Sequence, residues 1–138
     1  MEQEILEGLH ERIVKTFMDI LILTELNDDN AISGYDVIAF IHNNFHMRIS
    51  SGTVYSAIYS LERNGLIEGY WNKRKRTYKL TTKGKETIKT VLNASEKIQK
   101  LMARLEPKPQ NVKRNQLTSF FLNHFSTYSS RTVENTLL

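Results

Sequence analysis

The sequence predicts an α+β fold that is mostly α-helical, with several helices arranged around one small hairpin. Apolar residues recur at spacings of three and four over residues 3–26, 83–105 and 112–125, which is the pattern of amphipathic helices. Residues 66–80 are instead rich in aromatic and β-forming side chains, so the strands are expected there. The 138 residues, 40% of them apolar, can bury one modest hydrophobic core.

The chain is expected to begin with one amphipathic helix over residues 3–26. Its apolar positions follow helical spacing: Leu6, Leu9, Ile13, Phe17, Ile20 and Leu21. The polar residues 27–30 compete for backbone hydrogen bonds and predict a turn. Ser33 and Asp36 have the spacing of a capping box, which predicts a second helix over residues 34 to 43 or 44.

A third helix is expected after a short extended connector at residues 47–49. Ser50 or Ser51 can cap its start, and Gly65 can end it by adopting a positive φ. Its core face carries Val54, Ala57, Ile58 and Leu61. Its opposite face is polar and aromatic, which favours a contact surface over a place in the core.

This third helix is a candidate recognition helix for DNA. The major groove is about 12 Å wide and admits a helix whose first turn faces the base edges. The residues expected to contact DNA are Ser51, Gly52, Thr53, Tyr55, Ser56 and Tyr59. Two alternatives stay open: the two tyrosines, four residues apart, cover the hairpin instead, and Arg63 caps the helix end or contacts a distal phosphate rather than reading a base.

A basic hairpin follows the third helix. Its strands are expected over residues 66–71 and 76–80, joined by residues 72–75. The cations of its tip are Lys73, Arg74, Lys75 and Arg76. They are expected to lie over the sugar-phosphate backbone or in the minor groove, where they add affinity more than sequence preference. Helices followed by a basic hairpin in this order predict a winged helix-turn-helix.

A long helix is expected over residues 83–105, capped by Thr81 or Thr82 and about 34 Å in length. Apolar residues recur on it every seven positions, a pattern typical of two paired helices. The residues expected to form this dimerisation seam are Ile88, Val91, Leu92, Ile98, Leu101, Met102 and Leu105. Prolines at 107 and 109 end the helix, and a further amphipathic helix is expected over residues 112–125.

Charge is distributed unevenly along the chain, whose net charge is +4. Residues 1–36 hold nine acids and two bases, whereas residues 37–138 hold seventeen bases and six acids. Residues 70–85 contain seven bases and no acid. Such a basic stretch is either a solvated face or the contact for a polyanion, and beside a recognition helix it favours double-stranded DNA as the partner.

Composition excludes several classes of function. The chain has no cysteine, which removes disulfides, thiol nucleophiles and thiolate metal sites and fits an intracellular protein. The acidic residues 1–20 do not resemble a secretory leader, so we expect a cytoplasmic location and no membrane contact. No constellation of nucleophile, base and oxyanion donors is evident, and neither an enzyme nor a cofactor is expected.

Two further features carry competing interpretations. His42 and His46 have the spacing of a helical metal pair, but the second helix is expected to end between them, so no metal site is expected. The aromatic residues Phe17, Tyr35 and Trp71 either line a ligand pocket or belong to the core. The core is the expected place, because large aromatic side chains are usually buried there.

Three segments resemble the PadR-like winged-helix transcriptional regulators. They are SGYDVIAFI (residues 33–41), ISSGTVYSAIYSLERNGLIEGYW (residues 49–71) and RTYKLTTKGKE (residues 76–86). The resemblance extends over about residues 4–90 and implies that Tyr55 is the tyrosine of the recognition helix. It also implies dimers built through the N-terminal and the long C-terminal helix, binding to inverted repeats, and in many members release by a small aromatic or hydrophobic effector.

We therefore expect residues 1–82 to form a winged helix-turn-helix domain that binds DNA, and residues 83–138 to form a helical region for dimerisation and effector binding. The expected function is a sequence-specific transcriptional regulator, a repressor, that binds an inverted-repeat operator as a homodimer and responds to a ligand. The alternative is a winged-helix module that docks on another protein without specific DNA binding.

Overall fold

The computed structural model describes residues 1–105, and the chain divides into two compact units at Ile88 and Lys89. The first unit holds α1 (Glu2–Thr16), α2 (Met18–Leu26), β1 (Ile32–Ser33), α3 (Gly34–Phe45), α4 (Ser51–Arg63), β2 (Ile67–Asn72) and β3 (Lys75–Leu80). The helix α5 (Thr82–Asn93) begins in this unit, and α6 (Ser95–Ala103) belongs to the second. This mostly helical α+β architecture is the expected one. The helix expected over residues 112–125 and the prolines at 107 and 109 lie outside the described residues.

The two long helices predicted over residues 3–26 and 83–105 are each divided in two, so the prediction that they are continuous is wrong. The first breaks at Phe17, where φ is −95° and ψ is 14°. The helix α2 is buried on nearly all sides, whereas α1 is mostly exposed and has Val14 as its one buried residue. The second breaks at Ala94, where φ is −87° and ψ is 2°.

The start of α3 has the predicted capping box. The Asp36 N–H donates to Ser33 Oγ at 3.3 Å, and the Ser33 N–H donates back to Asp36 Oδ2 at 2.8 Å. The helix ends at Phe45, slightly later than expected, because the buried Phe45 ring packs edge-to-face on Phe40 at 5.9 Å and extends the apolar face. His46 then adopts a left-handed conformation with φ of 51°.

Removal of the Ser33 cap should destabilise the start of α3. Ser33→Ala deletes the acceptor of the Asp36 N–H and a hydroxyl that donates to Asp36 Oδ2 at 2.7 Å. We expect a loss of about 1 kcal/mol in the free energy of unfolding, measured by urea denaturation. Ser60→Ala, on the exposed face of α4, is the control and should stay within about 0.5 kcal/mol of the wild type. Equal stability of both variants would contradict this role of Ser33.

The helix α4 and the hairpin that follows it have the expected order, with a tighter turn. The Ser50 side chain caps α4 by accepting from the Thr53 N–H, and Gly65 follows the helix with φ of 70°. Asn72 and Lys75 are paired across β2 and β3, so the loop contains only residues 73–74 rather than 72–75. Continued strand pairing up to Asn72 and Lys75 shortens the loop, and Lys73 turns the chain with φ of 56°.

The sheet contains a strand that the sequence did not predict. The two residues of β1 pair antiparallel with β3, Ile32 opposite Tyr78 and Ser33 opposite Thr77, which gives the order β1-β3-β2. A strand of two residues is too short for any periodicity to indicate it. It connects the hairpin by backbone hydrogen bonds to the residues that open α3.

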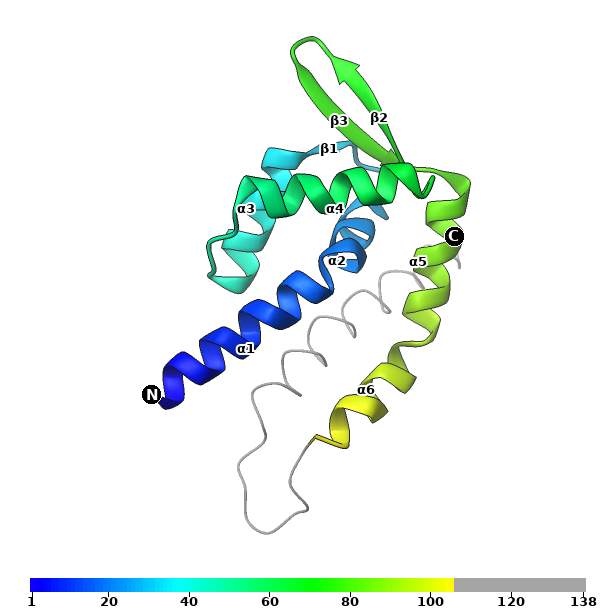
Figure 1. The fold of residues 1–138 in the computed structure, drawn as a ribbon. Coiled ribbons are helices and arrows are strands. Elements are labelled where there is room, and N and C mark those ends of the chain that lie inside the picture. Colours follow the sequence, from blue (N-terminus) through cyan, green and yellow to red (C-terminus); the bar gives the residue numbers. More distant parts are fainter. Residues whose placement is uncertain (106–138) are drawn as a thin grey trace. The chain divides into compact units, whose positions relative to one another are not determined.

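The helices α2, α3 and α4 pack around one apolar core, and the hairpin of β2 and β3 begins near the C-terminal end of α4 and rises away from the helices (Figure 1). The largest fully buried side chains of this unit are Val14, Ile22, Leu26, Val37, Ile41, Val54, Ile58, Ile67 and Ile88. Since α4 buries one face in this core, its other face is turned outward. No helix among the described residues combines the length and the apolar character that a membrane crossing requires.

Candidate nucleic-acid interface

The outward face of α4 carries the residues that the sequence assigned to DNA contact. Ser51, Gly52, Ser56 and Tyr59 are exposed, whereas Thr53 and Tyr55 are half-buried. The Thr53 hydroxyl lies 2.8 Å from Ser50 Oγ, so it is engaged in the cap of the helix. The first two turns of α4 therefore present small polar groups to solvent, as a helix that reads base edges requires.

Tyr55 has a place that the sequence did not predict. Its ring lies over the start of α3, where a Cβ atom built on Gly34 would be 2.5 Å from Tyr55 Cζ. The rings of Tyr55 and Tyr59 are 6.1 Å apart and tilted by 36°. Gly34 therefore lets the α4 tyrosine pack directly on the backbone of α3, and Tyr59 is the more exposed member of the pair.

Two of the four cations of the hairpin are held by carboxylates of the helices. Lys75 Nζ lies 3.1 Å from Asp36 Oδ2, and Arg76 Nη2 lies 2.7 Å from Glu62 Oε1. These partners are 39 and 14 residues away in the sequence. Among residues 1–105, no salt bridge involves the other two tip cations, Lys73 and Arg74. Lys75 and Arg76 are therefore held by ion pairs, whereas Lys73 and Arg74, the two residues of the turn, are in no salt bridge of the described residues.

The pKa values of Arg76 and Asp36 are both shifted from their usual values. The hydrogen bond with Glu62 raises the pKa of Arg76, which stays protonated. Hydrogen bonds from the side chain and backbone of Ser33, with a smaller effect of Lys75, lower the pKa of Asp36 from its usual 3.8. The contribution of Asp36 to stability is thus complete above pH 3.8 and is lost as the pH falls through the lowered pKa of the folded state.

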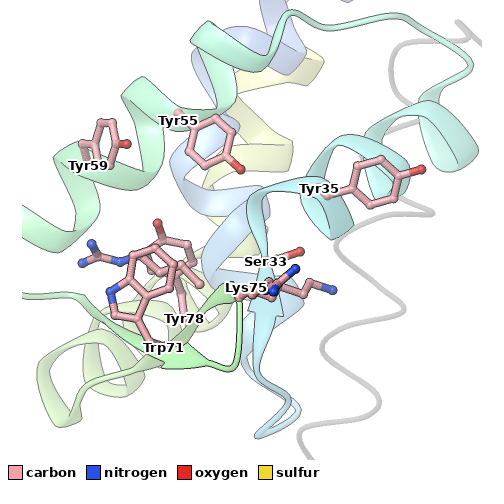
Figure 2. A pocket seen from close by; sticks show the side chains of 9 residues that line it. Ser33, Tyr35, Tyr55, Tyr59, Trp71, Lys75 and Tyr78 are labelled. Carbon is pink, nitrogen blue, oxygen red and sulfur yellow. The ribbon is translucent and has the colours of Figure 1, made fainter.

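An open hollow of about 570 Å³ separates α4 from the hairpin (Figure 2). Its lining is aromatic and basic: Ser33, Tyr35, Tyr55, Tyr59, Trp71, Arg74, Lys75, Arg76 and Tyr78. Tyr35 and Trp71 are 72% and 71% exposed, so the expectation that they belong to the core is wrong. Both side chains instead belong to the lining of this hollow.

The residues assigned to the dimerisation seam differ in exposure. Ile88 and Leu92 are buried within the chain itself, with exposed fractions of 0% and 5%. Leu101 and Leu105 are exposed, and the remaining three members, Val91, Ile98 and Met102, are half-buried. The part of the seam that remains open to a partner helix therefore lies mostly on α6 and just beyond it.

Within the described part of the chain, no group of three or more His, Asp or Glu side chains could hold a metal ion. His42 lies in α3, and His46 caps its end in the left-handed conformation. The helix thus ends between the two histidines, as the sequence predicted. Their i,i+4 spacing is not carried by one continuous helix.

The helix pair α3 and α4, followed by a hairpin whose inner strand also pairs with β1, defines a winged helix-turn-helix. Proteins with a helix-turn-helix place its second helix in the major groove of DNA. The profile of the transcriptional regulator PadR-like family matches residues 22–90, which is half of the chain. The protein belongs to this family of DNA-binding transcriptional regulators.

Solved structures share this fold. A PadR family transcriptional regulator from Eggerthella lenta has a TM-score of 0.64 at 18% identity, over 75% of this chain and 94% of that one. A transcriptional regulator from Clostridium thermocellum has a TM-score of 0.60 at 22% identity, over 70% and 96%. A PadR family regulator from Clostridium difficile has a TM-score of 0.54 at 25% identity, over 64% and 97%. No curated protein matches the sequence.

Proposed function

We propose that this protein is a sequence-specific transcriptional repressor that binds an inverted-repeat operator as a homodimer. One observation carries the proposal. The exposed polar face of α4 and the cations Lys73 and Arg74 lie on two elements of one winged helix-turn-helix, and both elements contribute residues to the same basic and aromatic hollow. This arrangement suits a duplex whose major groove receives the helix while its backbone meets the hairpin.

Each element has its own role in the proposed complex. Ser51, Gly52 and Ser56 face the base edges, with Tyr59 beside them, and confer sequence preference. Thr53 and Tyr55 are half-buried and support this surface from below. They contact the bases only at the edge of the exposed face of α4. Lys73 and Arg74 contact phosphates and supply affinity that depends on salt.

The proposal assigns residues 1–82 to DNA binding and residues 83–138 to dimerisation and effector binding. The exposed Leu101 and Leu105 support a helix-pairing role for the second unit, because apolar side chains at such spacing pair with a second helix. Two recognition helices in a dimer would read half-sites about 34 Å apart. A small aromatic or hydrophobic ligand that alters this pairing would release the operator. The proposed location is the cytoplasm.

Selection from random duplexes tests the proposal. The full-length protein is incubated at physiological salt with a pool of random duplex DNA, and the retained sequences are determined. Enrichment of an inverted repeat supports a dimeric, sequence-specific regulator. Retention without enrichment, with dissociation constants of about 10⁻⁴ to 10⁻⁶ M, would contradict sequence-specific recognition and favour a module that docks on another protein.

Loss of the two cations at the turn should reduce the salt dependence of DNA binding. Lys73→Gln and Arg74→Gln each remove one phosphate contact from the wing, which is the hairpin of β2 and β3. Each loss makes the decrease of log K with log salt less steep by about 0.9 per wing. The measurement is fluorescence anisotropy of a labelled duplex at several salt concentrations. Lys75→Gln is the matched control and should change the slope less, because Lys75 is already paired with Asp36. Equal slopes for all three variants would contradict the assignment.

A further inference from the structure

One carboxylate of α4 forms hydrogen bonds with both strands of the hairpin. Glu62 lies in the last turn of α4 and is only 29% exposed. Its Oε1 accepts from Arg76 Nη2 on β3 at 2.7 Å and from the Gly69 N–H on β2 at 3.2 Å. A single side chain therefore binds both strands of the hairpin to the helix.

The surroundings of Arg76 fix this contact. Its guanidinium lies 6.0 Å from the ring centre of Trp71 and 5.7 Å from that of Tyr78. Its Nε is buried and has no hydrogen-bond partner among the described residues. Arg76 therefore lies near two aromatic rings, and its guanidinium is paired with Glu62 while the side chain stays 38% exposed. A residue placed to bind phosphate would instead present its donors to solvent.

Gly69 shows how closely the three groups fit. A Cβ atom at this position would lie 2.6 Å from Arg76 Nε and 2.9 Å from Glu62 Oε1. Any side chain on residue 69 would therefore push the pair apart. The φ of Gly69 is not positive, so a side chain here would be opposed by the ends of the Arg76 and Glu62 side chains and not by the backbone conformation.

We propose that Glu62 is a positioning residue for DNA recognition: by bridging Arg76 and Gly69 it sets the angle of the wing relative to α4. The inference rests on the proposed function, in which α4 and the wing bind one duplex together. A wing held at a fixed angle contacts the DNA backbone only when α4 lies in the major groove at the correct position along the duplex. Specific complexes therefore gain from the anchor, whereas non-specific complexes, which depend on charge alone, do not.

The charge of Glu62 and its positioning role have opposite effects on DNA affinity, so a substitution can distinguish them. A carboxylate beside a DNA-binding surface repels phosphate, so its removal by itself should tighten every complex. Positioning predicts instead that Glu62→Ala weakens the specific complex about tenfold while non-specific binding stays equal or tightens. Glu62→Gln removes the same charge but keeps an acceptor oxygen, so it should fall between the wild type and Glu62→Ala.

Two further variants separate charge from geometry. Gly69→Ala changes no charge but displaces the pair, and it should also weaken specific binding about tenfold. Glu68→Gln is the matched control, because Glu68 is an exposed carboxylate on the same strand whose partner is the Tyr70 hydroxyl. It should bind the specific duplex at least as tightly as the wild type.

Binding of the selected duplex and of a scrambled duplex is measured by anisotropy for each full-length variant. Specific affinity in Glu62→Ala and Gly69→Ala that equals or exceeds the wild type would overturn the positioning role. A wild type without any preferred duplex would instead overturn the proposed function.

The free protein provides an independent readout of the same anchor. In Glu62→Ala the Gly69 amide should exchange its hydrogen faster, and emission from the single tryptophan, Trp71, should change as Arg76 is released. Unchanged exchange and emission would also overturn the positioning role.

Discussion

Replacement of Gly84 with alanine is expected to destabilise the protein by about 2 kcal/mol, although alanine is normally the better helix former. A Cβ atom on Gly84 would clash with the carbonyl oxygen of Leu66, a backbone atom that cannot rotate away. That oxygen accepts from the Thr81 N–H at 3.1 Å, so the start of α5 is fixed against it. Overpacking of this kind costs about 3 kcal/mol, and the helix propensity of alanine returns only about 1 kcal/mol.

Gly8→Ala is the matched control for this prediction. Gly8 also lies inside a helix, α1, but a Cβ atom there would have no neighbour within 4 Å. The same substitution should therefore stabilise the protein by about 0.5–1 kcal/mol. Urea denaturation of both variants measures the two opposite shifts. Stabilisation by Gly84→Ala would show that α5 does not approach Leu66 so closely.

Ile58→Ala and Ser56→Ala should separate the two faces of α4. Ile58 is 1% exposed in the core, and its truncation should lower the free energy of unfolding by about 2–5 kcal/mol. Below its unfolding transition, this variant should retain the sequence preference of the wild type, because the outer face is unchanged. Ser56 is exposed, so Ser56→Ala should leave stability within about 0.5 kcal/mol.

For DNA binding the order of the two variants should be the opposite: Ser56→Ala should change specific affinity, whereas Ile58→Ala should not change sequence preference. Ser56→Ala removes a hydroxyl from the proposed base-reading face and should weaken the specific complex roughly fivefold, or about 1 kcal/mol. Its affinity for a scrambled duplex should stay the same. Anisotropy with both duplexes, performed alongside the denaturation curves, provides the comparison. Equal losses on both duplexes would count against base recognition by Ser56.

The sequence predicted the elements whose causes are local. The capping box of Ser33 and Asp36, the positive φ of Gly65 and the end of α3 before His46 depend on neighbours within a few residues. The breaks at Phe17 and Ala94 were missed, since apolar spacing continues through both positions and only the backbone angles reveal them. Helical periodicity therefore indicated which residues face the core but not where each helix bends.

The candidate site was predicted by composition and not by geometry. The sequence predicted α4 and the basic hairpin as elements, yet it treated residues 73–76 as four equivalent cations. Only the fold brings Glu62 to Arg76 and Asp36 to Lys75, because their separations of 14 and 39 residues leave no periodic trace. A glycine within a strand, Gly69, was the one available indication of a close approach, and sequence reasoning did not use it.

The strand order β1-β3-β2 also bears on how the wing avoids self-association. The inner strand β3 is paired on both sides at Thr77 and Tyr78, so the described sheet leaves the outer edge of β2 open. An open edge can recruit strands from other chains and seed aggregates. Here the edge is only six residues long, and its Gly69 N–H is already taken by Glu62. The wing can thus extend into solvent toward a nucleic acid while it offers other polypeptides little backbone to pair with.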